Sequence, residues 1–316
     1  MIKPSDKFEL HYYFTDNSHS MNATVRNECE RELLLIIKEL IVSLNVEIEI
    51  DSEAFLEGGL KNWWKAFGKN SAQITLILAV LTVIISRIPV ENKELVKLQI
   101  ENLKLDNEIK QNELKKIKQE VKTDEDVTDE IVEKVIEKFD NDYKIIWHKS
   151  NFYKKLNFYL KVDKISTQLL DNNNKPTNPE RTVLRNQFPL LIVHSDKFPP
   201  LIDDEAVIDI VSPVLTKGNF QWKWIYKGQV LSFEMKDKEF KNSVLNKQVE
   251  FVNGIAIKCV LHQNRKIDEI GIIQTVNSQV LTVLEIVESD NIIETYQGKK
   301  YRKVKKENDK QMKLFQ

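Results

Sequence analysis

One uncharged segment constrains this chain more than any other feature. Residues 72–86 (AQITLILAVLTVIIS) carry no charged side chain, although 30% of the whole sequence is charged. A helix needs about 17–25 apolar residues to cross a bilayer, so this segment lies at the short end of that range. Shorter apolar runs are typical of a helix buried in a protein core, which is the alternative interpretation.

The residues that flank the segment favour a membrane. Trp63 and Trp64 stand between Lys61 and Lys65 just before it, and Arg87 follows it. Tryptophan with nearby lysine is typical of a bilayer interface, because the indole ring is apolar while its N–H needs a polar partner. We therefore predict an interfacial segment and one transmembrane helix over residues 63–90. A signal peptide is not expected, because such peptides lie within about the first 15–30 residues.

Composition excludes several classes of protein. The formal net charge is −1, so overall charge predicts no affinity for nucleic acid or membranes. The two cysteines, Cys29 and Cys259, form no disulfide framework and no zinc-site spacing, and they favour a reducing environment. Phosphate-cradling glycine motifs and the common hydrolase motifs are absent from the sequence. We expect no cofactor, no metal and no catalytic residues.

The segments on either side of the span predict the domain organisation. Residues 1–62 read as a small α/β unit, with strands near 8–14 and 46–50 and a helix over 22–43. Such a thin unit needs another surface to cover it. Residues 91–142 carry apolar positions at heptad-like spacing and predict a helical stalk. The alternative is that this helix packs on its own C-terminal domain.

The remainder of the chain reads as β structure. Residues 143–298 contain short strands with turn signals between them, of which Asn253-Gly254 is the strongest, and they predict a small barrel or sandwich. The tail, residues 299–316, is basic, and it either binds phosphates or lipid headgroups or is a solvated, disordered tail. The predicted fold class is thus an α+β membrane protein: a small N-terminal α/β unit, one transmembrane helix, a helical stalk and a mainly-β C-terminal domain.

A strand with alternating aromatic and basic residues is the first candidate site. In FQWKWIYK, residues 220–227, the four rings share one face of the strand and Lys223 lies on the other. Aromatic platforms with neighbouring cations bind single-stranded nucleic acid on β-barrels. The alternative is that the rings fill the barrel. The predicted ligand-binding residues are Trp222, Lys223, Trp224, Lys227 and Lys236.

Two further groups are candidates. Thr75, Thr82 and Ser86 are spaced by 7 and 4 residues, so they lie on one helical face and would line a pore between several copies of the span. The alternative is that these hydroxyls bond to carbonyls one turn back. Near the N-terminus, His, Asp and Ser side chains could bind a metal or form a nucleophile and base, or simply cap the following helix. That group is His11, Asp16, Ser18, His19 and Ser20.

Several longer stretches resemble a known class of protein. They are residues 11–23 (HYYFTDNSHSMNA), 25–30, 212–222, 233–237 and 254–259. Together they resemble membrane proteins from bacterial anti-phage defence operons that often stand beside a nucleotidyltransferase. The nearest named system is Hailong, whose membrane effector is a ligand-controlled ion channel. The resemblance implies a role but no site residues.

From the residues and the resemblance together, we expect an oligomeric membrane effector of anti-phage defence. It would be an ion channel gated by a nucleotide or single-stranded oligonucleotide on the C-terminal domain. Its expected location is the bacterial inner membrane, with the C-terminal domain cytoplasmic. Expected partners are the lipid bilayer, further copies of the chain in a tetramer, and a cognate nucleotidyltransferase. The alternatives are a membrane-anchored scaffold without channel activity and an enzyme that uses His11, Asp16 and His19.

Overall fold

The computed structural model describes most of the chain and divides it into two compact units, Met1–Ser195 and Asp196–Gln316. Each unit is described by itself below. The described residues are 2–16, 18–53, 60–88, 114, 116–117, 121, 127–140, 142–193, 196–216, 218, 220–249, 251, 254–268, 271–288 and 291–314. The division differs from the expected boundaries at residues 62, 90, 142 and 298. Residues 143–193, which we expected in the β-rich domain, belong to the first unit.

The first unit is built on a five-stranded sheet with the strand order β2-β3-β1-β4-β5. All of its strand pairs are antiparallel. The central strand alternates as its sequence predicts, so that Phe8, Leu10 and Tyr12 are buried in the core. The strands are β1 (Lys7–Phe14), β2 (Ile48–Glu53), β3 (Leu60–Gly68), β4 (Val162–Leu170) and β5 (Arg181–Leu184).

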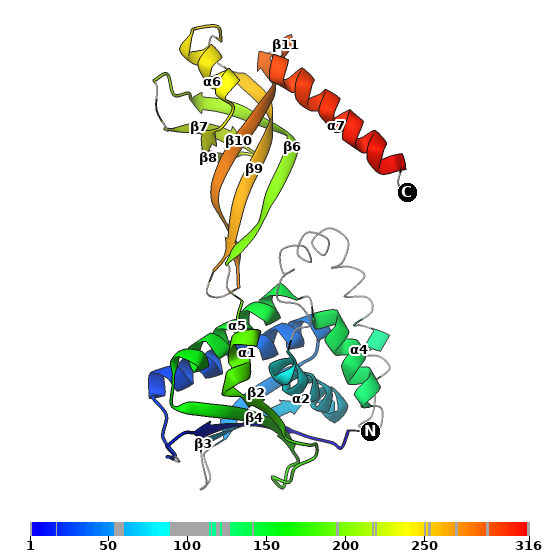
Figure 1. Ribbon diagram of the computed structural model, residues 1–316. Coiled ribbons are helices and arrows are strands. Elements are labelled where there is room, and N and C mark those ends of the chain that lie inside the picture. The colour runs from blue at the N-terminus through cyan, green and yellow to red at the C-terminus, as the bar shows by residue number, and fades with distance from the viewer. Residues whose placement is uncertain are drawn as a thin grey trace. The chain divides into compact units, whose positions relative to one another are not determined.

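The helices of this unit lie on one side of its sheet (Figure 1). They are α1 (Ala23–Leu44), α2 (Ser71–Ser86), α4 (Asp129–Phe139), α5 (Tyr143–Phe158) and the short 3₁₀ helix η2 (Arg185–Leu191). Asn22 caps the start of helix α1, because its side chain accepts from the backbone N–H groups of Thr24 and Val25. It ends at Asn45 in the left-handed conformation, a common way to terminate a helix.

Helix α2, the uncharged segment, is the centre of this core. It contacts β1, β3, β4 and β5 as well as α1 and α4. Residues 76–82 are buried without interruption, because neighbours surround the helix. An all-round apolar helix belongs either in a membrane or in a protein interior, and here the interior provides the contacts. Among the described residues, no helix has the length and apolar content needed to cross a membrane. With 16 residues, α2 is only about 24 Å long.

Two parts of the predicted fold class are therefore corrected. The transmembrane helix predicted over 63–90 is wrong, because α2 is buried within its own unit, and the membrane and ion-channel assignments that rested on it have no support from the described residues. The tryptophans before it are not an interfacial segment but part of β3, where Trp64 stacks on Phe8 with ring centroids 5.5 Å apart. Most of the predicted stalk lies outside the described residues. Its last part forms α4, which packs against α2.

The first and last turns of α2 exchange hydrogen bonds with other elements. At the C-terminal end, the Tyr153 hydroxyl donates to the Ile85 carbonyl at 2.7 Å, and the Lys149 ammonium donates to the Arg87 carbonyl. In the first turns, Thr75 Oγ1 accepts from the Ser5 backbone N–H at 3.0 Å. The last carbonyls of a helix have no partner within the helix and are costly to bury alone. Helix α5 thus makes the burial of α2 possible.

The second unit contains a closed β-barrel. Its strands pair in the ring β6-β7-β8-β10-β9, with β9 returning to β6. Strands β8 and β10 pair in parallel, and α6 lies between β8 and β9 in the chain. This connectivity is that of the OB-fold, a five-stranded Greek-key barrel. The elements are β6 (Lys197–Ser212), β7 (Gln221–Tyr226), β8 (Gln229–Met235), α6 (Lys238–Leu245), β9 (Ile255–Ile267), β10 (Ile273–Glu288), β11 (Asn291–Glu294) and α7 (Tyr296–Leu314).

Asp237 connects the barrel strands to both helices of this unit. Its Oδ1 accepts from the Phe240 N–H at 2.9 Å and caps α6. Its Oδ2 accepts from the Val283 N–H at 2.8 Å and from the Gln297 amide at 3.2 Å. The carboxylate is buried and therefore needs these donors. One side chain thus fixes α6 and the start of α7 on β10.

The burial of α2 generates a stability prediction. We expect Leu78→Ala to lower the free energy of unfolding by about 2–5 kcal/mol, because it leaves a cavity at a fully buried position. The matched control is Val83→Ala, at a partly exposed position of the same helix, which should cost clearly less. Urea unfolding without detergent measures both. Equal, small effects would contradict the burial of α2.

Candidate functional site

The aromatic residues of the barrel strand do not form a binding surface. Trp222 and Trp224 are both 0% exposed, and their rings pack against Phe233, Phe240 and each other inside the barrel. The prediction that they stack on a ligand is corrected, because the aromatic face of β7 points into the barrel. The alternative interpretation, that the rings fill the barrel, is the one that the structure supports.

The three lysines predicted to accompany those rings are on the surface but do not converge. Lys223 is exposed on the outer face of β7, opposite Ser232 of β8. Lys227 lies in the β7–β8 turn with a positive φ of 50°, over the Tyr226 ring. Lys236 pairs with Glu234. They are separate basic positions rather than one site.

The hydroxyls predicted to line a pore are inside the first unit. Thr75 bonds to the backbone of Ser5. Thr82 donates to the Ala79 carbonyl at 2.7 Å, and Ser86 donates to the Thr82 carbonyl at 2.9 Å. The pore-lining role is therefore withdrawn together with the membrane helix. Thr82 and Ser86 make the carbonyl bonds that were the alternative interpretation.

The N-terminal group of His, Asp and Ser side chains is not assembled into one centre. His11 lies within β1, whereas Asp16 lies beyond its end, where it pairs with Lys161 at 3.2 Å and accepts from the Ser18 N–H. His19 and Ser20 are exposed. Among the described residues, no three His, Cys, Asp or Glu side chains are placed to hold a metal ion.

The structure instead gathers His11 with other polar residues on the sheet face away from the helices. Antiparallel pairing puts His11 between Lys61 of β3 and Ser166 of β4, and puts Glu9 beside Trp63. We name this surface the polar sheet face. It comprises Glu9, His11, Tyr13, Lys61, Trp63, Lys164, Ser166 and Glu180.

Direct contacts hold the side chains of this face in place. The Trp63 indole N–H donates to Glu9 Oε2 at 2.6 Å, and the Lys61 ammonium donates to Glu9 Oε1 at 3.2 Å. Glu9 is itself buried, so these donors offset the loss of water around its charge. The carboxylate therefore fixes the position of the Trp63 ring and of one cation.

A second set of contacts orders the other rings. The rings of His11 and Tyr13 lie 3.8 Å apart between centroids, and the Lys164 ammonium lies 4.2 Å from the centre of the Tyr13 ring. The Tyr13 hydroxyl donates to Glu180 Oε1 at 2.8 Å. Both rings are half-buried, so each still presents part of its surface to solvent. The face thus combines three ordered rings with two ammonium groups.

The ionisation of the face follows from its contacts. Partial burial, with the nearby charge of Lys61, lowers the pKa of His11, so the imidazole is mostly neutral at pH 7. Burial raises the pKa of Tyr13. The hydroxyls of Ser166 and Tyr13 lower the pKa of Glu180 and keep it charged. Neutral rings beside lysines suit a planar, anionic ligand.

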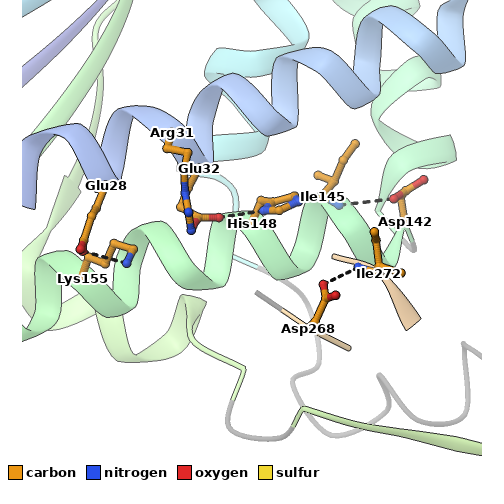
Figure 2. Close-up of polar contacts among 9 residues, drawn as sticks. All are labelled: Glu28, Arg31, Glu32, Asp142, Ile145, His148, Lys155, Asp268 and Ile272. Atoms are coloured by element: carbon orange, nitrogen blue, oxygen red, sulfur yellow. Dashed lines mark hydrogen bonds and ion pairs between the residues drawn. The ribbon is translucent and has the colours of Figure 1, made fainter. Parts of the chain in front are cut away.

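A buried pair lies away from this face, between α1 and α5. His148 Nδ1 and Glu32 Oε2 are 2.7 Å apart, with side chains only 4% and 1% exposed (Figure 2). Arg31 also contacts Glu32, and the flanking Glu28 pairs with Lys155 at 2.9 Å. Such a buried polar pair is best explained as fixing how the two helices pack.

Lys149, also on α5, is a buried lysine with a strongly lowered pKa. Burial lowers its pKa to about 7, although Asp140 acts in the opposite direction. Its ammonium donates to the carbonyl of Arg87 at the end of α2, and the Arg87 guanidinium pairs with Glu133 at 2.5 Å and with Asp140 at 3.3 Å. Perturbed lysines occur at active sites, but this one satisfies a buried helix end.

Sequence reasoning missed most of the polar sheet face. Only His11 was named as a candidate, whereas Glu9, Tyr13, Trp63 and Lys164 were not. The alternation of residues 7–14 (KFELHYYF) shows that Glu9, His11 and Tyr13 share one face of a strand. The other members come from strands that only the fold brings beside β1. Comparison of the chain with protein-family models, with curated proteins and with solved structures found no match.

The buried lysine generates a prediction of pH dependence. The pKa of Lys149 in the folded state is below that of the unfolded chain, so between pH 7 and about 10.4 the unfolded state binds the additional proton. We therefore expect its contribution to stability to rise with pH across that window and to be constant below it. Lys149→Met should remove that rise, at about 1.4 kcal/mol per pKa unit.

Urea unfolding at pH 7 and pH 9.5 measures this difference between the variant and the native protein. The control is Lys154→Met, at an exposed position of the same helix, which should leave the pH dependence unchanged. A Lys149→Met protein with the pH dependence of the native chain would show that the ammonium keeps its normal pKa.

Proposed function

We propose that this chain is a nucleotide- or oligonucleotide-binding protein and that the polar sheet face holds the bases. The observation that carries the proposal is the placement of three aromatic rings and two lysines on one sheet face that the helices leave uncovered (Figure 1). Aromatic side chains on the open face of a sheet stack on bases in RNA-binding modules. The lysines then pair with phosphates.

The strength of such contacts is sufficient for useful affinity. Stacking contributes about 1–3 kcal/mol for each base, so two occupied rings contribute about 2–6 kcal/mol. With one or two phosphate contacts added, this corresponds to a dissociation constant between about 1 mM and about 1 μM. The two carboxylates of the face, Glu9 and Glu180, repel an anionic ligand less strongly than two free carboxylates would, because each already accepts hydrogen bonds from its neighbours. Glu9 already bonds to Trp63 and Lys61, and Glu180 bonds to Tyr13.

Two further considerations support a nucleotide ligand. The second unit has OB-fold connectivity, and OB-folds bind oligonucleotides, although a fold by itself does not establish a function. The resemblance to proteins found beside a nucleotidyltransferase also agrees with a nucleotide signal. A role in anti-phage defence and assembly into a tetramer stay predictions.

Replacing the rings tests the proposal. We expect Tyr13→Ala and Trp63→Ala each to weaken binding about 5- to 150-fold, which corresponds to the loss of one stacked base. Fluorescence anisotropy with labelled single-stranded 8-mers, and competition by nucleoside mono- and triphosphates, measures the affinity. Phe158→Ala removes an exposed ring elsewhere in the same unit and is the matched control.

The outcome that contradicts the proposal is equally definite. Failure of the native protein to bind any of these probes would exclude it. The same holds if binding occurs but both ring variants keep the affinity of the Phe158→Ala control. The enzyme alternative predicts a different result, namely turnover that depends on His11.

A further inference from the structure

The basic C-terminal segment is a helix that is fixed to the barrel at its start. Thr295 Oγ1 accepts from the Gly298 N–H at 2.9 Å and donates to the Val283 carbonyl at 2.5 Å. At Gly298 the helix approaches β10 so closely that an added Cβ would lie 2.3 Å from the Leu284 carbonyl oxygen. The first turn of α7 therefore cannot shift without breaking this contact.

Ion pairs continue the attachment along the same side of α7. Arg302 contacts both Glu294, at 2.7 Å, and Glu285. One turn on, Lys305 pairs with Asp204 at 2.7 Å, and Tyr301 donates to the same carboxylate at 3.1 Å. These residues account for part of the positive charge of the segment. Residues 296–307 therefore form a docked helix rather than the solvated, disordered tail that was the alternative interpretation.

Three other lysines form a stripe on a different side of the helix. Lys299, Lys303 and Lys306 follow i, i+4, i+7 spacing, which places them on one face, and all three are exposed. Among the described residues, none of them has an acidic partner. Like charges at these spacings repel each other and weaken a helix slightly. We call this set the lysine stripe.

We infer that the lysine stripe binds the phosphate backbone of a nucleic acid. Its three ammonium groups extend over roughly 10 Å along a helix that is already held against the barrel. Phosphate binding therefore costs little backbone conformational entropy. Lysine contacts to phosphate give affinity without reading the sequence. The stripe would therefore position a strand rather than select one.

The composition of the helix favours nucleic acid over a membrane surface. Helices that lie on membranes have a continuous apolar face with Trp, Phe or Leu beside the basic residues. Over residues 296–307 of α7, one side is occupied by the ionic attachment to the barrel, and the exposed large apolar side chains are only Tyr296 and Val304, eight residues apart. The inference does not rest on the polar sheet face, which belongs to the other unit.

The salt dependence of binding tests the stripe directly. A protein that contacts fewer phosphates releases fewer counterions, so its affinity depends less on salt. We expect the triple variant Lys299→Gln, Lys303→Gln, Lys306→Gln to reduce the slope of log K against log salt by about 2 for a single-stranded 20-mer. Anisotropy titrations of the labelled 20-mer from 50 to 200 mM NaCl measure the slope.

The control variant changes the same net charge elsewhere. Lys3→Gln, Lys38→Gln and Lys154→Gln, all exposed in the first unit, should leave the slope within about 0.5 of the native value. Circular dichroism confirms that both triple variants are folded. An unchanged slope in the stripe variant, or an equal loss in the control, overturns the inference.

Two more measurements separate this inference from its alternatives. Trp63→Ala should weaken binding of the 20-mer without changing the salt slope, whereas the stripe variant should change the slope. Failure of the sheet-face proposal and failure of the stripe inference therefore give different results.

Vesicles with 30% phosphatidylserine are the second probe. If the stripe variant loses vesicle binding but keeps the native salt slope for the 20-mer, the surface recognises lipid and the inference is wrong.

Discussion

The packing of α2 determines the architecture of residues 1–195. This helix is apolar on nearly every side, so it must be surrounded, and the sheet, α1 and α4 surround it. Burial of that much apolar surface is the main favourable term for such a unit. The sheet can consequently leave its other face open, because the core lies entirely on the helix side.

Burying a whole helix also requires partners for its ends, and α5 provides them. Tyr153 and Lys149 bond to the last carbonyls of α2, while Glu32 and His148 fix α5 against α1. The helices and the sheet therefore depend on each other. The same packing holds β1, β3 and β4 in register, which places the rings and lysines of the polar sheet face on one side of the sheet.

The sequence predicted which residues form helices and strands better than it predicted what surrounds each of these elements. The strand near residues 8–14 and the helix over 22–43 are present, because alternation and helical spacing are local signals. For residues 72–86, however, protein core and lipid demand the same apolar side chains, so the pattern does not distinguish them. Trp63 and Trp64 were misread for a similar reason, since a β-strand and a membrane interface both favour tryptophan.

The candidate site was harder to predict than the fold. Alternation in β7 shows that Trp222 and Trp224 share a face but not which face is inside the barrel. The polar sheet face depends on the pairing of β1 with β3 and β4, which are separated from it by about 50 and 150 residues of sequence. Its composition was visible only after these pairings were known.

The central claim is that α2 is held in the core of its own unit. Hydrogen exchange of the native protein in buffer without detergent or lipid tests it most directly. The account predicts that the amides of residues 75–85 exchange more slowly than most others, through global unfolding of the unit. Rapid exchange of those amides in buffer, with protection only after addition of lipid, would contradict it.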